Sequence, residues 1–127
     1  MAGIDVLDIG RRYAAAMEQK TGAVPELFAD EVSCWWNTNT AGRTTNGKEM
    51  AVAINHGHPG AANWRVEVDS VRAMETGFVV SLAVRANQKD GTPVSAHVCQ
   101  IVTLNDEGLI AKWEEFVDQK QHEAING

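Results

Sequence analysis

Two carboxylates near the C-terminus, Glu114 and Asp118, are the residues best suited to acid–base chemistry. They lie in a run, residues 109–118, whose composition favours a β-strand. Because side chains alternate across a strand, the residues expected on one face are Lys112, Glu114, Phe116 and Asp118, and those on the other are Trp113, Glu115 and Val117. A carboxylate enclosed by apolar groups has a raised pKa and becomes a usable base near neutral pH. At a rim, the same carboxylates would instead be solvated or paired with Arg or Lys.

Helices at the start of the chain must support this strand. Apolar residues at helical spacing predict a first helix at 4–20, and Pro25 suits a short second helix at 24–28. The turn signal Asn46-Gly47 precedes a third helix at 48–55. The polar tail, 119–127, is expected to fray.

One β-like run lies between the second and third predicted helices, and four more follow the third helix. They span residues 32–37, 64–74, 78–87, 94–104 and 109–118. Short connections between the last four make the sheet mostly antiparallel. We therefore expect one α+β domain over residues 1–127, in which three N-terminal helices pack on a strongly curved sheet. Such a cone-shaped domain encloses one pocket.

Composition excludes several classes of partner. The 127 residues carry a formal net charge of −6 and no extended run of Lys or Arg, which argues against nucleic acid. No apolar stretch reaches the roughly 18 residues of a membrane span, and Asp5 and Asp8 interrupt the place of a signal peptide, so a cytoplasmic protein is expected. His56 and His58 have no further ligand nearby, and no phosphate-binding loop is present. We expect no metal and no organic cofactor.

The order of elements resembles the nuclear-transport-factor-2-like superfamily, in particular its ketosteroid-isomerase-like and SnoaL-like (polyketide cyclase-like) branches. The segments that carry the resemblance are Arg12-Tyr13, residues 27–32, residues 46–49, residues 108–110 and residues 113–118. The resemblance implies a cone that holds a small apolar organic molecule. It also implies that Tyr13 donates a hydrogen bond to a substrate oxygen, that Glu114 is the acid/base of the cyclases, and that Asp118 matches the terminal aspartate of epoxide hydrolases.

Departures from these relatives matter as much as the matches. Trp36 stands where the isomerases have an aspartate base, and Gln100 stands where they have a protonated acid and the cyclases a histidine. Neither an indole nor an amide can serve as a base, so the isomerase proton shuttle is absent. Arg85 lacks the acid two residues away that epoxide hydrolases require. Epoxide hydrolysis is therefore a minor alternative.

The expected pocket joins these positions to their neighbours. Its ligand-binding residues are Trp36, Gln100, Val98, Phe116 and Asn37. Strand alternation places His97 outside if Gln100 faces in; with the opposite register, His97 would be the best acid/base in the chain. Trp35 must face away from Trp36, and Trp113 would lie outside with Ile101 and Cys99 as an apolar patch. We expect this outer face to form a homodimer and Cys34 and Cys99 to remain thiols.

Two functions remain open at this point. The first is an isomerase, cyclase or hydrolase that acts on an oxygen-containing metabolite through Glu114 or Asp118, with Tyr13 and Gln100 orienting an oxygen. The second is the binding or sensing of an apolar ligand without chemistry. A protein-interaction module built on the outer sheet is a weaker alternative.

Overall fold

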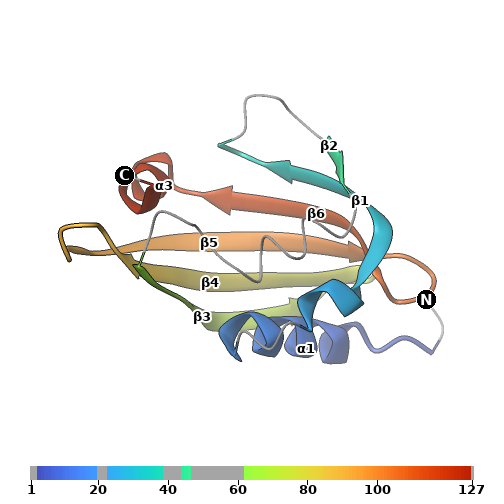
Figure 1. Ribbon diagram of the computed structural model, residues 1–127. Helices are drawn as coiled ribbons and strands as arrows, with labels where there is room; N and C mark the ends of the chain where they lie inside the picture. The colour runs from blue at the N-terminus through green and yellow to red at the C-terminus, as the bar shows by residue number, and fades with distance from the viewer. Residues whose placement is uncertain (1–2, 20–22, 39–43, 47–61, 127) are drawn as a thin grey trace.

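A six-stranded sheet covered on one face by helix α1 forms the body of the protein (Figure 1). The computed structural model describes residues 3–19, 23–38, 44–46 and 62–126. The strand order is β2-β1-β6-β5-β4-β3, and only the β1–β6 pairing within it is parallel. The strands are β1 (Phe28–Trp36), β2 (Thr44–Asn46), β3 (Ala62–Ala73), β4 (Gly77–Asn87), β5 (Pro93–Leu104) and β6 (Ile110–Val117). The predicted α+β class with a mostly antiparallel sheet is confirmed.

Helix α1 (Val6–Gln19) begins after Asp5, whose Oδ1 accepts a hydrogen bond from the backbone N–H of Asp8 at 3.1 Å. Its apolar side packs on β3 and β4. Gly10 permits this close approach, because a Cβ there would press on Val71 and Phe78. The short second helix is the 3₁₀ helix η1 (Val24–Leu27). The predicted third helix, with His56 and His58, lies outside the described residues.

The face of the sheet on which α1 packs is called the inner face below, and the opposite one the outer face. On β5 the inner side chains include Val98, Gln100 and Val102, all buried. His97 and Cys99 alternate with them and point outward. The predicted inward orientation of Gln100, and with it the outward orientation of His97, is confirmed.

A β-bulge in β6 decides which of its carboxylates faces inward. Thr103 pairs with Lys112, whereas the next residue of β5, Leu104, pairs with Ile110, so β6 contains one extra residue at Ala111. The alternation that begins at the buried Ile110 is therefore reversed by Trp113, which is also buried. Beyond the bulge, Trp113, Glu115 and Val117 face inward.

The predicted orientation of β6 is therefore wrong. Glu114 and Phe116 lie on the outer face, opposite Ile101 and Cys99 of β5. Trp113, expected in the outer apolar patch, is only 3% exposed and belongs to the core. The acidic side chain on the inner face is Glu115, one residue after the one that the resemblance selected.

The C-terminal tail forms helix α3 (Gln119–Asn126), where we expected frayed chain. Asp118 caps this helix, because its Oδ1 accepts a hydrogen bond from the N–H of Gln121 at 3.0 Å. The Gln121 side chain in turn accepts a hydrogen bond from the backbone N–H of His97 at 2.7 Å, which attaches α3 to β5. None of the helices in the described part of the chain has the length and apolar character to cross a membrane.

Candidate functional site

Four polar side chains are linked on the inner face. The indole N–H of Trp113 donates to the hydroxyl oxygen of Tyr13 at 3.1 Å. The Tyr13 hydroxyl donates to Oε1 of Gln100 at 2.6 Å, and Nε2 of Gln100 donates to Oε1 of Glu115 at 3.0 Å. One helix and two strands thus bring together residues that are 100 positions apart. We call these residues the inner polar cluster.

The side chains of the inner polar cluster differ in how far packing encloses them. Tyr13 is fully buried, and its ring contacts Phe28 and Phe78 at centroid distances of 6.3 and 5.6 Å. Gln100 is 4% exposed and stands directly across the β5–β6 ladder from Glu115. Glu115 is less enclosed than Gln100. The cluster therefore runs from a sealed phenol to a more accessible carboxyl group.

Burial dominates the electrostatics of the cluster. It raises the pKa of Glu115 above its ordinary value of 4.5, and the hydrogen bond from Gln100 offsets only part of this rise. Burial also raises the pKa of the Tyr13 phenol, despite the hydrogen bond from Trp113. Tyr13 thus stays protonated, whereas the pKa of Glu115 is raised in the direction of neutral pH, as a proton donor or acceptor requires.

Among the sequence-predicted residues, Trp36 and Val98 also occupy the inner face. Trp36 packs against the core and pairs with Glu115 across the parallel β1–β6 ladder. Trp35 faces outward, where its ring contacts Phe116 at a centroid distance of 5.2 Å. The predicted inward orientation of Trp36 is confirmed.

Tyr13 is on the inner face, but its hydroxyl is not directed at an open space. The Tyr13 hydroxyl donates its proton in a hydrogen bond to Oε1 of Gln100, and its oxygen accepts a hydrogen bond from Trp113, so both of its hydrogen-bonding roles are already filled. Direct donation from Tyr13 to a substrate oxygen would require breaking the bond to Gln100. In this structure Tyr13 supports the cluster from within.

The other predicted site residues lie elsewhere. Glu114 is on the outer face, with its carboxylate 3.9 Å from Nζ of Lys112. Asn37 uses both ends of its amide on the backbone of Val117, at 2.9 and 3.0 Å, and so prolongs the pairing of β1 with β6. Asp118 caps α3, and Phe116 is 38% exposed on the outer face. These residues are not part of the inner polar cluster.

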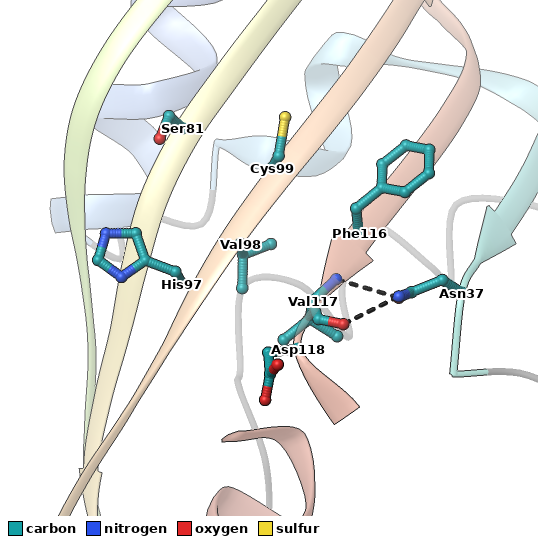
Figure 2. Close-up of a pocket in the computed structure, with 8 residues that line it drawn as sticks. All are labelled: Asn37, Ser81, His97, Val98, Cys99, Phe116, Val117 and Asp118. Carbon is teal, nitrogen blue, oxygen red and sulfur yellow. Dashed lines mark hydrogen bonds between the residues drawn. The ribbon is translucent and has the colours of Figure 1, made fainter. Parts of the chain in front are cut away.

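Several of them line a separate groove of about 340 Å³ (Figure 2). The residues around it are Asn37, Ser81, His97, Val98, Cys99, Phe116, Val117 and Asp118. The predicted site thus divides between two places. Cys99 lies at this groove while Cys34 is buried in the core, and the two do not form a disulfide. The described residues contain no group of three or more His, Cys, Asp or Glu that is arranged to hold a metal ion.

Sequence reasoning missed Glu115 and the role of Trp113. Trp113 is the largest apolar side chain of β6, and burying it would have placed Glu115 inward with it. The family resemblance favoured Glu114 instead.

The amino-acid sequence matches one known protein family. Residues 9–113 match the family described as SnoaL-like domain. No curated protein matches the sequence.

Solved structures match over nearly the whole chain. An LEH-like epoxide hydrolase from M. tuberculosis is 13% identical with a TM-score of 0.71, covering 94% of this chain and 88% of that one. A hypothetical protein with a ketosteroid isomerase-like fold from Catenulispora acidiphila, in complex with trimethylamine, is 16% identical with a TM-score of 0.72, covering 97% and 95%. SalBIII, an epoxide hydrolase/cyclase-like enzyme of pyran ring formation in the polyether salinomycin, is 17% identical with a TM-score of 0.66, covering 90% and 91%. At these identities the likeness shows the fold alone.

Proposed function

Because the chain belongs to the SnoaL-like domain family, we propose that it binds a small, largely apolar, oxygen-containing organic molecule against the inner face of its sheet. We further propose that Glu115 transfers a proton to or from that molecule. The observation that carries this proposal is the Glu115 carboxyl group, whose pKa is raised by burial and which is held by Gln100.

The proposed reaction is isomerisation, cyclisation or hydrolysis. Such reactions require a proton to leave carbon or oxygen, or to reach an oxygen, and a carboxyl group whose pKa is raised toward neutral pH does either. Trp36 provides an apolar wall beside Glu115 but cannot accept a proton. Glu115 is therefore the acid/base that the inner polar cluster supplies.

Epoxide opening is less well supported than proton transfer at a carbonyl compound. Arg85, the arginine considered for polarising an epoxide, has its Nε 2.8 Å from the carboxylate of Glu67. Both side chains are about half exposed, and Glu67 pairs with Ala83 on the outer face. Arg85 is thus directed away from Glu115.

The second candidate function is ligand binding without chemistry. It is favoured by the fact that the hydrogen-bonding roles of the Tyr13 hydroxyl are satisfied within the protein. A ligand would then bind by apolar contact with Trp36 and one hydrogen bond to Glu115.

A panel of small ketones, lactones and epoxides tests both functions. Binding near Trp36 should quench tryptophan fluorescence, and Trp36→Phe should remove most of that change, whereas Trp35→Phe, on the outer face, should not. Turnover of a bound compound supports the enzyme, and binding without turnover supports the sensor. If the Trp35 variant loses the signal instead, the ligand binds on the outer face and the proposal is wrong.

We also propose that two copies associate in the cytoplasm through the outer face. Phe116 is exposed there beside Trp35, with Cys99 and Ile101 next to it on the neighbouring strand. Removing this apolar surface from water would favour a dimer. The patch differs from the predicted one in containing Phe116 and Trp35 in place of Trp113.

Light scattering tests the dimer. We expect twice the chain mass of 13.8 kDa for the native protein and a single chain mass for Phe116→Glu, because the new charge would be buried at the interface. Thr92→Glu, at an exposed turn, should remain dimeric. A native mass of 13.8 kDa at micromolar concentration would rule the dimer out.

A further inference from the structure

The hydrogen bonds of the inner polar cluster run in one direction. An indole N–H can only donate, so the oxygen of Tyr13 must accept from Trp113. The hydroxyl proton of Tyr13 is then free to point at Oε1 of Gln100, 2.6 Å away. The N–H of Trp113 and the O–H of Tyr13 therefore both donate in the direction of Gln100. This direction cannot be reversed, because an indole has no acceptor atom.

This direction fixes the Gln100 amide. With Oε1 on Tyr13, Nε2 faces Glu115. In the opposite orientation the amide N–H would meet the Tyr13 hydroxyl and leave its proton without an acceptor in the cluster. It would also set Oε1 of Gln100 against a carboxylate oxygen. The orientation is therefore dictated by chemistry and not only by the shape of the site.

We propose that Trp113 and Tyr13 are positioning residues that act through Gln100, holding its amide N–H on Oε1 of Glu115 and leaving Oε2 as the carboxyl oxygen that meets the ligand. This inference rests on the proposed role of Glu115. Among the described residues, the carboxyl group of Glu115 has no hydrogen bond or ion pair except the hydrogen bond from Gln100.

Few titratable groups lie beside the inner polar cluster in the described part of the chain. Tyr13 of α1 and Cys34 of β1 are the titratable groups that accompany Glu115 on the inner face. The neighbouring strand β5 contributes the neutral Gln100 there, while Lys112 and Glu114 of β6 are on the outer face. A change of charge at Glu115 should therefore reach Tyr13 in two ways, directly through space and through the hydrogen bonds of Gln100.

The single tyrosine of the chain gives a direct test. Growth on 3-fluorotyrosine labels Tyr13 alone, and its ¹⁹F resonance can be followed with pH. We expect one transition at the same midpoint as the Glu115 carboxyl, measured by ¹³C NMR, and no such transition in Glu115→Gln. In Gln100→Leu the Glu115 carboxyl should still titrate, but the ¹⁹F transition should shrink to the part that the direct effect of the Glu115 charge produces. A ¹⁹F transition of undiminished size in folded Gln100→Leu, or its absence in the native protein while Glu115 titrates, would overturn the inference.

Tyr13→Phe supplies an independent measurement if the Gln100 variant does not fold. Without the hydroxyl, the Gln100 amide can also turn its Oε1 toward Glu115, but only when that carboxyl carries a proton. One extra arrangement of equal energy doubles the population of the protonated form, so the Glu115 midpoint should rise by about 0.3 unit. The 3-fluorotyrosine protein keeps the hydroxyl and should keep the native midpoint.

A purely structural role for Tyr13 would lower the melting temperature of Tyr13→Phe without moving the Glu115 midpoint, and that result would also overturn the inference. Different results would refute this inference and the proposed function. An unchanged Glu115 midpoint in Tyr13→Phe refutes the positioning role of Tyr13, whereas unchanged turnover in Glu115→Gln refutes the catalytic role of Glu115.

Discussion

Replacing Glu115 with glutamine is expected to reduce turnover by roughly 100-fold or more while ligand binding is largely retained. The amide keeps the shape of the side chain and can still accept a hydrogen bond from Gln100, which donates to Glu115 at 3.0 Å. It can no longer take up or release a proton, and general acid–base catalysis usually contributes about 10²–10⁴-fold. Single-turnover kinetics on a compound identified from the ligand panel measures the loss.

Glu114→Gln is the matched control, because it makes the same change one residue away on the outer face beside Lys112. Its turnover should remain within a few-fold of the native rate. Loss of activity in Glu114→Gln with full activity in Glu115→Gln would show that the orientation of β6 described above is wrong. Full activity in both variants would favour ligand binding without chemistry.

The same Glu115→Gln substitution should stabilise the folded protein at pH 8. Burial raises the pKa of Glu115 above 4.5 in the folded state, so between 4.5 and the raised value the folded chain binds more protons than the unfolded chain. The free energy of unfolding therefore falls as pH rises through this window, and the loss persists at higher pH. Glutamine carries no charge at any of these pH values and removes the loss.

Urea unfolding at pH 4 and pH 8 measures this effect. Each unit of raised pKa corresponds to about 1.4 kcal/mol, so the variant should gain stability relative to the native protein between the two pH values, in proportion to the rise in the Glu115 pKa. Taking the difference between the proteins cancels the contributions of the other carboxylates. Equal dependence of the two proteins on pH, or a greater gain for the native protein at pH 8, would show that the folded state does not penalise the Glu115 charge.

Much of the fold follows from the sequence because its signals are local and strong. The amphipathic pattern around Tyr13 predicts α1, and the runs that became β3, β4 and β5 were bounded by short turns. The inward orientation of Gln100 follows from alternation along β5, where no bulge interrupts the pairing with β4. For such elements, local pattern and tertiary structure agree.

The orientation of Glu114 and Glu115 was not predictable by the same means. The extra residue at Ala111 reverses the alternation within β6, and no glycine or proline marks it in the sequence. The choice between two adjacent carboxylates therefore depends on burying Trp113, which is a tertiary effect. The hydrogen bonds among Trp113, Tyr13 and Gln100 likewise depend on how α1 packs across the sheet.

The C-terminal helix escaped prediction for a related reason. Residues 119–126 are polar and short, and a helix of this length has little stability by itself. Its stability comes from the Asp118 cap and from Gln121, which accepts the N–H of His97. In addition, Nε2 of Gln88 donates to the carbonyl of Ala124 at 2.9 Å. These contacts also show why Asp118, read from the sequence as a catalytic acid, is used at a helix start.

A ¹³C NMR titration of the glutamate carboxyl groups, with Glu115 assigned by the resonance that disappears in Glu115→Gln, tests most directly whether Glu115 is buried on the inner side of the sheet. There it lies beside Gln100, and its charged form is disfavoured. We expect a Glu115 midpoint clearly above 4.5. A midpoint at or below 4.5 would contradict it, because a carboxyl that ionises as it does in water is not held in an apolar site.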